Sequence, residues 1–264
     1  MKKKQLYLSI AVFASILVLL LLGIILLNNG GDGHHSISEV MKDGVLHETF
    51  KINFLGIKDV NPAVISAFSV TGILTVFALI VRIFVIPKFK IIPGKFQLLI
   101  ETAVGFFDNL SKSNSPHRNK FLGAYIFTAG AYIFTSTLFE LFGFQAVTTL
   151  GNSVSLPAPL ADINGAIAMG FLSYGIILYG GISANGIKGV GKALKEFSLP
   201  ISMSFRLFGA LLSGALVTEL VYHYKALSFG LPIIVGVVFT LLHAIIQTYV
   251  LTMLTSLFYG EVSE

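Results

Sequence analysis

The sequence predicts an all-α membrane protein with five core helical segments, preceded by an N-terminal hydrophobic segment. First, 55% of the 264 residues are hydrophobic and only 12% are charged, about half the charge of an average soluble domain. Second, apolar runs long enough to cross roughly 30 Å of hydrocarbon recur along the whole chain. Third, most basic residues fall in alternate loops, which is the positive-inside pattern of multi-span proteins. The absence of cysteine excludes disulfides, thiolate catalysis and cysteine-ligated metals.

The first segment has two interpretations. Three lysines at positions 2–4 precede an uncharged apolar run over 6–27, which suits either a transmembrane helix or a signal peptide. No small-x-small cleavage pattern follows, which favours retention. We therefore expect a signal-like or transmembrane segment over 1–29 and a non-cytoplasmic loop over 30–61. One membrane domain should then fill 62–264.

The core spans follow from the apolar runs and the loops between them. An amphipathic stretch over 93–110 is expected to lie along the membrane surface. Counting crossings places both termini inside, and it gathers the basic loop residues on that same side, so that they set orientation and need no nucleic-acid partner. No phosphate loop, metal-spaced histidine pair or hydrolase elbow occurs, so no cofactor or metal is expected. The spans are expected at 62–86, 121–144, 162–182, 199–220 and 229–259.

Arg206 is a charge inside an apolar span. A guanidinium cannot lose its proton in a protein, and burying it near the bilayer centre costs on the order of 3 kcal/mol. The side chain could instead extend to the headgroups and act only as an anchor. Helical periodicity favours a protein partner bearing a carboxylate, because four small residues share the face of Arg206 and let another helix approach closely: Ser202, Ala210, Ser213 and Gly214.

The last helix carries a polar stripe of Gly236, Thr240, His243 and Gln247. One interpretation is a single histidine buried for structure, since hydrogen-bonding side chains also hold membrane helices together. The other is that these groups and Glu219 line a wet path, along which a histidine with an unperturbed pKa near 6.5 could pass protons.

Three further polar residues lie at the expected outer ends of spans: Glu140, Asp162 and Asn164. They either cap helix termini or form the mouth of an aqueous vestibule. The residues alone leave both readings open.

Several motifs in one order resemble a known family. Ser204-Phe205-Arg206-Leu207-Phe208-Gly209 is followed by a last helix that contains Gln247. Ile92-Pro93-Gly94-Lys95-Phe96-Gln97 with Glu101, and Ala161-Asp162-Ile163-Asn164, precede them in the chain. Over roughly residues 45–260 the chain resembles subunit a of the F-type ATP synthase membrane sector.

The resemblance implies an ion-conducting stator subunit that catalyses nothing alone. Its two half-channels would connect a ring of c subunits to opposite sides of the membrane, with Arg206 as the essential arginine and Gln247 facing it. Further implied partners are peripheral-stalk b subunits, the F1 sector indirectly and the lipid bilayer. It also implies long, tilted last helices, a multi-pass location in a bacterial-type inner (plasma) membrane and a cytoplasmic C-terminus. The transported ion would be a proton or sodium.

The chain departs from the family pattern at several positions. Ala210 replaces the usual asparagine and Ala215 the usual carboxylate, for which Glu219, one turn later, could substitute. Near Thr240, His243 lies one turn closer to the glutamine. The stretch 192–200 is compressed, so the inner half-channel is expected to be built differently.

Two other functions remain open from the sequence. One is a secondary transporter in which Arg206 binds an anionic substrate, although the paired repeats and broken midplane helices of such folds are not evident. The other is a structural membrane subunit in which Arg206 forms an interface salt bridge.

Overall fold

The computed structural model describes residues 52–54, 56–115, 119–147, 153–223 and 231–264, together with Ser15 and Val18. The expectations for 1–29 and for most of 30–61 lie outside these residues. The chain divides into two compact units, 1–48 with 213–239 and 49–212 with 240–264, and each is described by itself. The second unit holds nearly all the elements discussed below.

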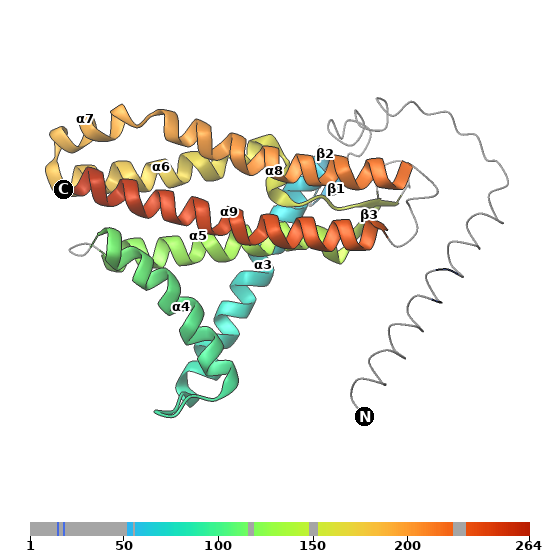
Figure 1. The fold of residues 1–264 in the computed structure, drawn as a ribbon, viewed down its shortest axis with the longest axis horizontal. Coiled ribbons are helices and arrows are strands. Elements are labelled where there is room, and N and C mark those ends of the chain that lie inside the picture. The colour runs from blue at the N-terminus through green and yellow to red at the C-terminus, as the bar shows by residue number, and fades with distance from the viewer. Residues whose placement is uncertain are drawn as a thin grey trace. The chain divides into compact units, whose positions relative to one another are not determined.

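The described elements are helical apart from two short hairpins, as Figure 1 shows. The strands are β1 (Ile52–Phe54), β2 (Ile57–Val60), β3 (Gln145–Val147) and β4 (Ser153–Ser155). The long helices are α3 (Pro62–Ile80), α4 (Lys95–Asn114), α5 (Asn119–Phe139), α6 (Ile163–Asn185), α7 (Ile187–Lys195), α8 (Ser198–His223) and α9 (Leu231–Ser263). Short helical turns lie at η1 (Val81–Val85), η2 (Ile86–Lys88), η3 (Glu140–Phe142) and η4 (Pro159–Ala161).

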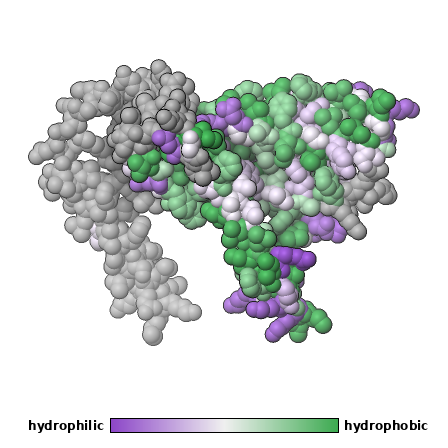
Figure 2. All heavy atoms as spheres, turned by 180° about the vertical axis from the view of Figure 1, so that it is seen from behind, coloured by the Kyte–Doolittle hydropathy of each residue, from purple (hydrophilic) through white to green (hydrophobic). Residues whose placement is uncertain are grey.

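The membrane fold class is confirmed. Among the described residues, four helices are long and apolar enough to span a bilayer: Pro62–Lys88, Phe121–Phe142, Ile163–Asn185 and Ile234–Ser263. A fifth candidate span joins α7 to Ser198–Gly214 through a bend of 47°. Figure 2 shows many hydrophobic side chains on the visible face, mixed with side chains of intermediate hydropathy, while the most hydrophilic ones lie mainly at its edges.

Local sequence explains where α3 begins and ends. Asn61 is its N-cap and accepts a hydrogen bond from the Ala63 N–H at 2.9 Å, while Pro62 takes the first helical position, where no donor is needed. Near the other end, Pro87 cannot donate to the helix, and its ring crowds the carbonyl one turn earlier. The helix accordingly widens into the π-helical turn η1 and closes in η2.

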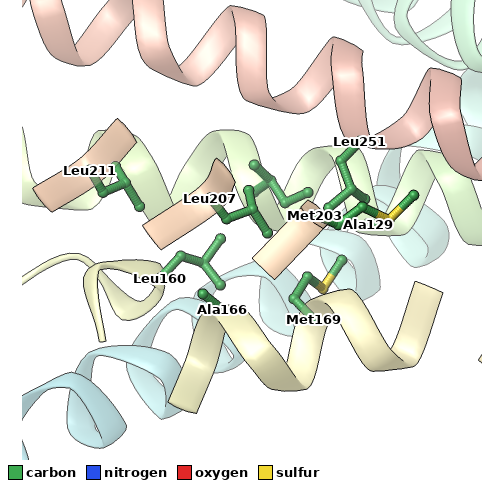
Figure 3. Close-up of a cluster of buried hydrophobic side chains, with 9 residues drawn as sticks. Ala129, Leu160, Ala166, Met169, Met203, Leu207, Leu211 and Leu251 are labelled. Atoms are coloured by element: carbon green, nitrogen blue, oxygen red, sulfur yellow. The ribbon is translucent and has the colours of Figure 1, made fainter. Parts of the chain in front are cut away.

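Two of the apolar clusters of the second unit lie inside the helical bundle. The first joins α5, α6, α8 and α9, which run side by side in Figure 1, and Figure 3 shows its side chains pointing at one another. The second lies at the end of the bundle where α5 begins and α6 and α9 finish, and it includes Leu122, Ile177 and Tyr259. Together they fix the position of the first half of α8.

Glycines let the helices approach closely at the α6–α7 turn. Gly186 adopts a left-handed φ of 58°, which L side chains rarely take, and it reverses the chain into α7. A Cβ at Gly181 would lie 2.9 Å from the Gly189 carbonyl oxygen, so the two backbones are in contact. The Tyr174 hydroxyl then donates to the Ala193 carbonyl at 3.0 Å and holds α7 against α6.

The two hairpins were not expected from the sequence. β1 pairs with β2, and β3 with β4, both antiparallel. Ile52 and Leu156 pack with Ile65, Val70 and Phe139 in a third apolar cluster. The strands are too short to produce a clear alternating pattern, which is why periodicity did not reveal them.

Candidate functional site

Arg206 lies on the exposed face of α8, surrounded by apolar residues. Its neighbour Phe205 is 63% exposed, whereas Met203 and Leu207, on the adjoining face of the helix, are buried. Within the described residues, no carboxylate of this chain forms an ion pair with Arg206. The charge is therefore presented outward from the packed part of the second unit.

The buried face of α8 fixes that orientation. Met203, Leu207 and Leu211 point into the first apolar cluster, toward Leu160, Ala166 and Met169 (Figure 3). Burying one such side chain contributes roughly 1.5 to 3 kcal/mol. Rotating α8 to bury Arg206 would expose the side chains of Met203, Leu207 and Leu211. Their packing therefore holds the guanidinium outward.

Gln247 of α9 lies directly beside Arg206. Its Nε2 atom donates to the Arg206 carbonyl oxygen at 3.3 Å, and the Gln247 residue is only 5% exposed. Both residues line a small depression between α8 and α9, together with Met203, Leu207, Val250, Leu251 and Leu254. The structure thus brings together the two residues that the sequence singled out most strongly, through the backbone of Arg206.

The small residues expected beside Arg206 differ in their exposure. Ser202 and Ser213 are exposed, while Ala210 and Gly214 are half-buried. A Cβ added at Gly209 would meet nothing within 4 Å. The residues around Arg206 on this helix therefore include several small side chains, as a close helical contact requires.

The polar groups of α9 differ in their surroundings. Thr240 and His243 are half-buried on the same helix as Gln247. Glu219 belongs to α8, but its side chain lies outside the described part. The path expected to join these residues to Glu219 therefore stays a prediction.

Asp162 has a cap geometry. Its Oδ1 accepts from the Asn164 N–H at 2.8 Å and the Gly165 N–H at 3.4 Å, at the first turn of α6. Its Oδ2 accepts from Asn61 Nδ2 at 2.6 Å, and Asn61 caps α3 in turn. One carboxylate thus connects two helix N-termini. Asn164 is exposed, and Glu140 is half-buried at the start of η3.

Asn61 is the residue that sequence reasoning missed. Its partnership with Asp162 spans 101 positions and could not be seen locally. The signal for its own cap was present, since an asparagine followed by a proline is typical of a helix start.

The comparison with protein families decides the identity. The model of the family described as "ATP synthase A chain" matches residues 65–260, which is most of the chain.

The chain belongs to this family.

Individual relatives agree with the ATP synthase A chain family. ATP synthase subunit a of Haemophilus ducreyi is 27% identical over 195 residues, covering 62% of this chain and 74% of the relative. The Cereibacter sphaeroides subunit a is 24% identical over 180 residues, covering 64% and 69%. The Histophilus somni subunit a is 27% identical over 197 residues, covering 63% and 73%.

Membership of the ATP synthase A chain family makes this chain a membrane subunit of the ATP synthase complex, with a part in ATP synthesis and ion transport. It also disfavours the alternative of a transporter in which Arg206 binds an anionic substrate. Among the described residues, no group of three or more histidine, aspartate or glutamate side chains could hold a metal ion.

Proposed function

We propose that this chain is the ion-conducting stator subunit of an F-type ATP synthase and that Arg206 is its essential charge. The single observation that carries the proposal is a permanent cation held outward on an apolar helix by the packing behind it. Such a charge calls for a carboxylate on a neighbouring chain. A ring of c subunits, each with one carboxylate, would supply it.

Arg206 would separate two half-channels by electrostatics. It pairs transiently with each unloaded ring carboxylate and repels cations that would otherwise leak straight across. A membrane potential delivers about 2.3 kcal/mol per elementary charge per 100 mV, so a leak there would dissipate the energy that drives rotation. Gln247 would support this role by holding the backbone of Arg206 to α9.

We assign the outer half-channel to Thr240 and His243, with Glu140 and Asn164 toward its mouth. Glu219 remains a candidate on the sequence alone. The cap geometry of Asp162 supports a structural role at this mouth, and not a role in ion transfer. Ser202, Ala210, Ser213 and Gly214 would let the ring pass closely. The ion, a proton or sodium, is selected largely by ligands of the ring.

The remaining partners and the location follow from the same proposal. Peripheral-stalk b subunits would hold the chain still, and the F1 sector would be reached only indirectly. The chain catalyses nothing alone. We place it in a bacterial inner membrane with its C-terminus in the cytoplasm, and treat 62–264 as one functional membrane domain.

Replacing Arg206 by alanine tests this function. We expect Arg206→Ala to abolish ATP-driven ion pumping in vesicles while the complex still assembles, because the ring carboxylates lose their counter-charge. Pumping is measured with a fluorescent pH or sodium indicator, and assembly by co-purification of the ring.

Arg82→Ala is the matched control. It removes the same charge from an exposed position in η1, the turn that follows α3, and normal pumping is expected. Coupled pumping in Arg206→Ala at the level of the Arg82→Ala control would reject the proposed role.

A further inference from the structure

The loop between η2 and α4 presents two isoleucines that no other described residue covers. Ile91 is 103% exposed and Ile92 84%, the highest values among the large apolar residues here apart from Ile187. Adjacent aliphatic side chains this exposed mark an interaction surface. Figure 2 shows hydrophobic and hydrophilic side chains lying together at this tip.

The charges around the two isoleucines are all positive. Lys88, Lys90 and Lys95 are exposed, and the stretch 88–95 contains no acidic residue. The nearest carboxylate along α4 is Glu101, which is already engaged as an acceptor from Gln97 Nε2 at 2.7 Å. A partner of this loop must therefore combine negative charge with apolar surface.

Gln97 holds the loop in one shape. Its Oε1 accepts from the Lys90 N–H at 3.0 Å, and its Nε2 donates to the Lys90 carbonyl at 2.9 Å. The side chain thus satisfies both backbone groups of Lys90, as a neighbouring strand would. Because the bond from Gln97 to Glu101 fixes the amide in turn, Ile91 and Ile92 project from an ordered loop.

The loop is continuous with a membrane span. It follows directly on Pro62–Lys88, whose last turns expose Ile83 and Phe84. A loop at this depth meets the boundary between headgroups and acyl chains, where apolar side chains insert and lysines remain beside phosphates. Charge complementarity and this continuity both favour lipid as the occupant.

We propose that residues 88–95 form a binding site for anionic phospholipid, in which Ile91 and Ile92 insert below the headgroups and the three lysines bind the phosphates. Gln97 is its positioning residue. The site adds a lipid-recognition function to the subunit and is independent of the role of Arg206.

A fluorophore at position 92 tests the site in the assembled ATP synthase. The chain has no cysteine, so Ile92→Cys provides the only label in this subunit, and the identically treated parent complex corrects for other subunits. The complex is placed in vesicles containing brominated phosphatidylglycerol or brominated phosphatidylcholine at equal mole fraction. Bromine quenches only fluorophores in contact with that lipid.

We expect quenching by both lipids and stronger quenching by brominated phosphatidylglycerol. Lys88→Gln with Lys90→Gln and Lys95→Gln should remove the preference, because each basic residue near an anionic surface contributes up to about a fivefold increase in binding. Lys188→Gln with Lys192→Gln and Lys195→Gln removes the same charge from α7 and should leave the preference unchanged. Gln97→Leu should reduce quenching by both lipids.

Three results would overturn the proposal. Equal quenching by the two lipids would show that the three lysines do not select the anionic headgroup. Absence of quenching together with protection from aqueous iodide would show that a protein subunit covers the loop. Absence of quenching with free access for iodide would show that the loop lies in water. None of these readings requires the lysine or glutamine variants to assemble.

Discussion

At the scale of single residues, Arg206 and Asp162 show two ways in which a charge is accommodated. Arg206 finds no ion-pair partner among the described residues, and it is held outward by the apolar side chains behind it. Asp162 is satisfied within the chain by two backbone N–H groups and one amide. Arg206 can therefore still bind a carboxylate of another chain, whereas the carboxylate of Asp162 is already used to hold the N-termini of two helices together.

Asp162 variants can separate its two candidate roles. Asp162→Asn retains a carbonyl oxygen for the cap of α6, whereas Asp162→Ala loses the cap and the bond from Asn61. A lost N-cap costs about 1 kcal/mol, and a lost hydrogen bond costs about as much again. We therefore expect Asp162→Ala to lower the melting temperature of the detergent-solubilised complex, and Asp162→Asn to lower it less while keeping coupled pumping.

Asn61→Ala is the companion of that test. It removes the cap of α3 and the same bond to Asp162, so its loss of thermal stability should resemble that of Asp162→Ala. Should Asp162→Asn assemble at normal stability yet fail to pump, the carboxylate would belong to the ion path after all.

At the scale of elements, length and hydropathy predicted the four core spans that stand as single helices, whereas the segment expected at 199–220 lies in α8, which forms the fifth candidate span only together with α7. An apolar run of this length must satisfy its backbone internally, and a helix is the simplest way to do so. Arg206 and Gln247 were equally accessible, because a charge and an amide inside apolar runs violate the local pattern. Three other features could not be predicted from the sequence: the hydrogen bond between Asn61 and Asp162, the two hairpins, and the hydrogen bonds from Gln97 to the backbone of Lys90. Each of them depends on pairing between distant parts of the chain or on backbone geometry.

Gly170 controls how closely α6 approaches the helix that carries Arg206. A Cβ there would collide with the Ser204 hydroxyl and lie 2.7 Å from the Pro200 carbonyl oxygen. Gly170→Ala must push α6 away from the first turns of α8, at a cost of about 1 to 3 kcal/mol. We expect a lower melting temperature of the complex and reduced coupled pumping.

The matched control lies on the same helix. A Cβ at Gly175 meets nothing within 4 Å, so Gly175→Ala should preserve stability or raise it, because alanine favours helix by up to about 1 kcal/mol. Equal behaviour of the two alanine variants would mean that the contact between α6 and α8 does not determine the position of Arg206.

At the scale of the whole molecule, helix length bears on how the chain lies in the bilayer. α9 has 33 residues, which corresponds to roughly 50 Å of helix against about 30 Å of hydrocarbon. A helix that exceeds the membrane thickness this much must tilt or extend beyond it. This supports the tilt implied by the resemblance, which remains a prediction because tilt is defined against a bilayer.

The packing within the second unit also bears on orientation. The ends of α6 and α9 meet α7 at one end of the bundle, where Gly181 approaches both Val262 and Gly189. The basic residues of α7 therefore share an end with the C-terminus. Ile52, Phe139 and Leu156 meet in a different cluster, with the hairpins and the start of α3. The positive-inside rule therefore predicts that the first of these ends is cytoplasmic.

Single cysteines can test this orientation, because the parent chain has none. We expect Lys192→Cys and Glu264→Cys to react with an impermeant maleimide only when the cytoplasmic face is open to the reagent, as in inverted vesicles. Ser155→Cys, on an exposed strand residue between α5 and α6, should react only from the opposite face, in intact spheroplasts. Each variant is the side-specific control for the others. Labelling of Glu264→Cys and Ser155→Cys from the same face would require an odd number of crossings to be lost or gained between them, and it would contradict the proposed cytoplasmic C-terminus.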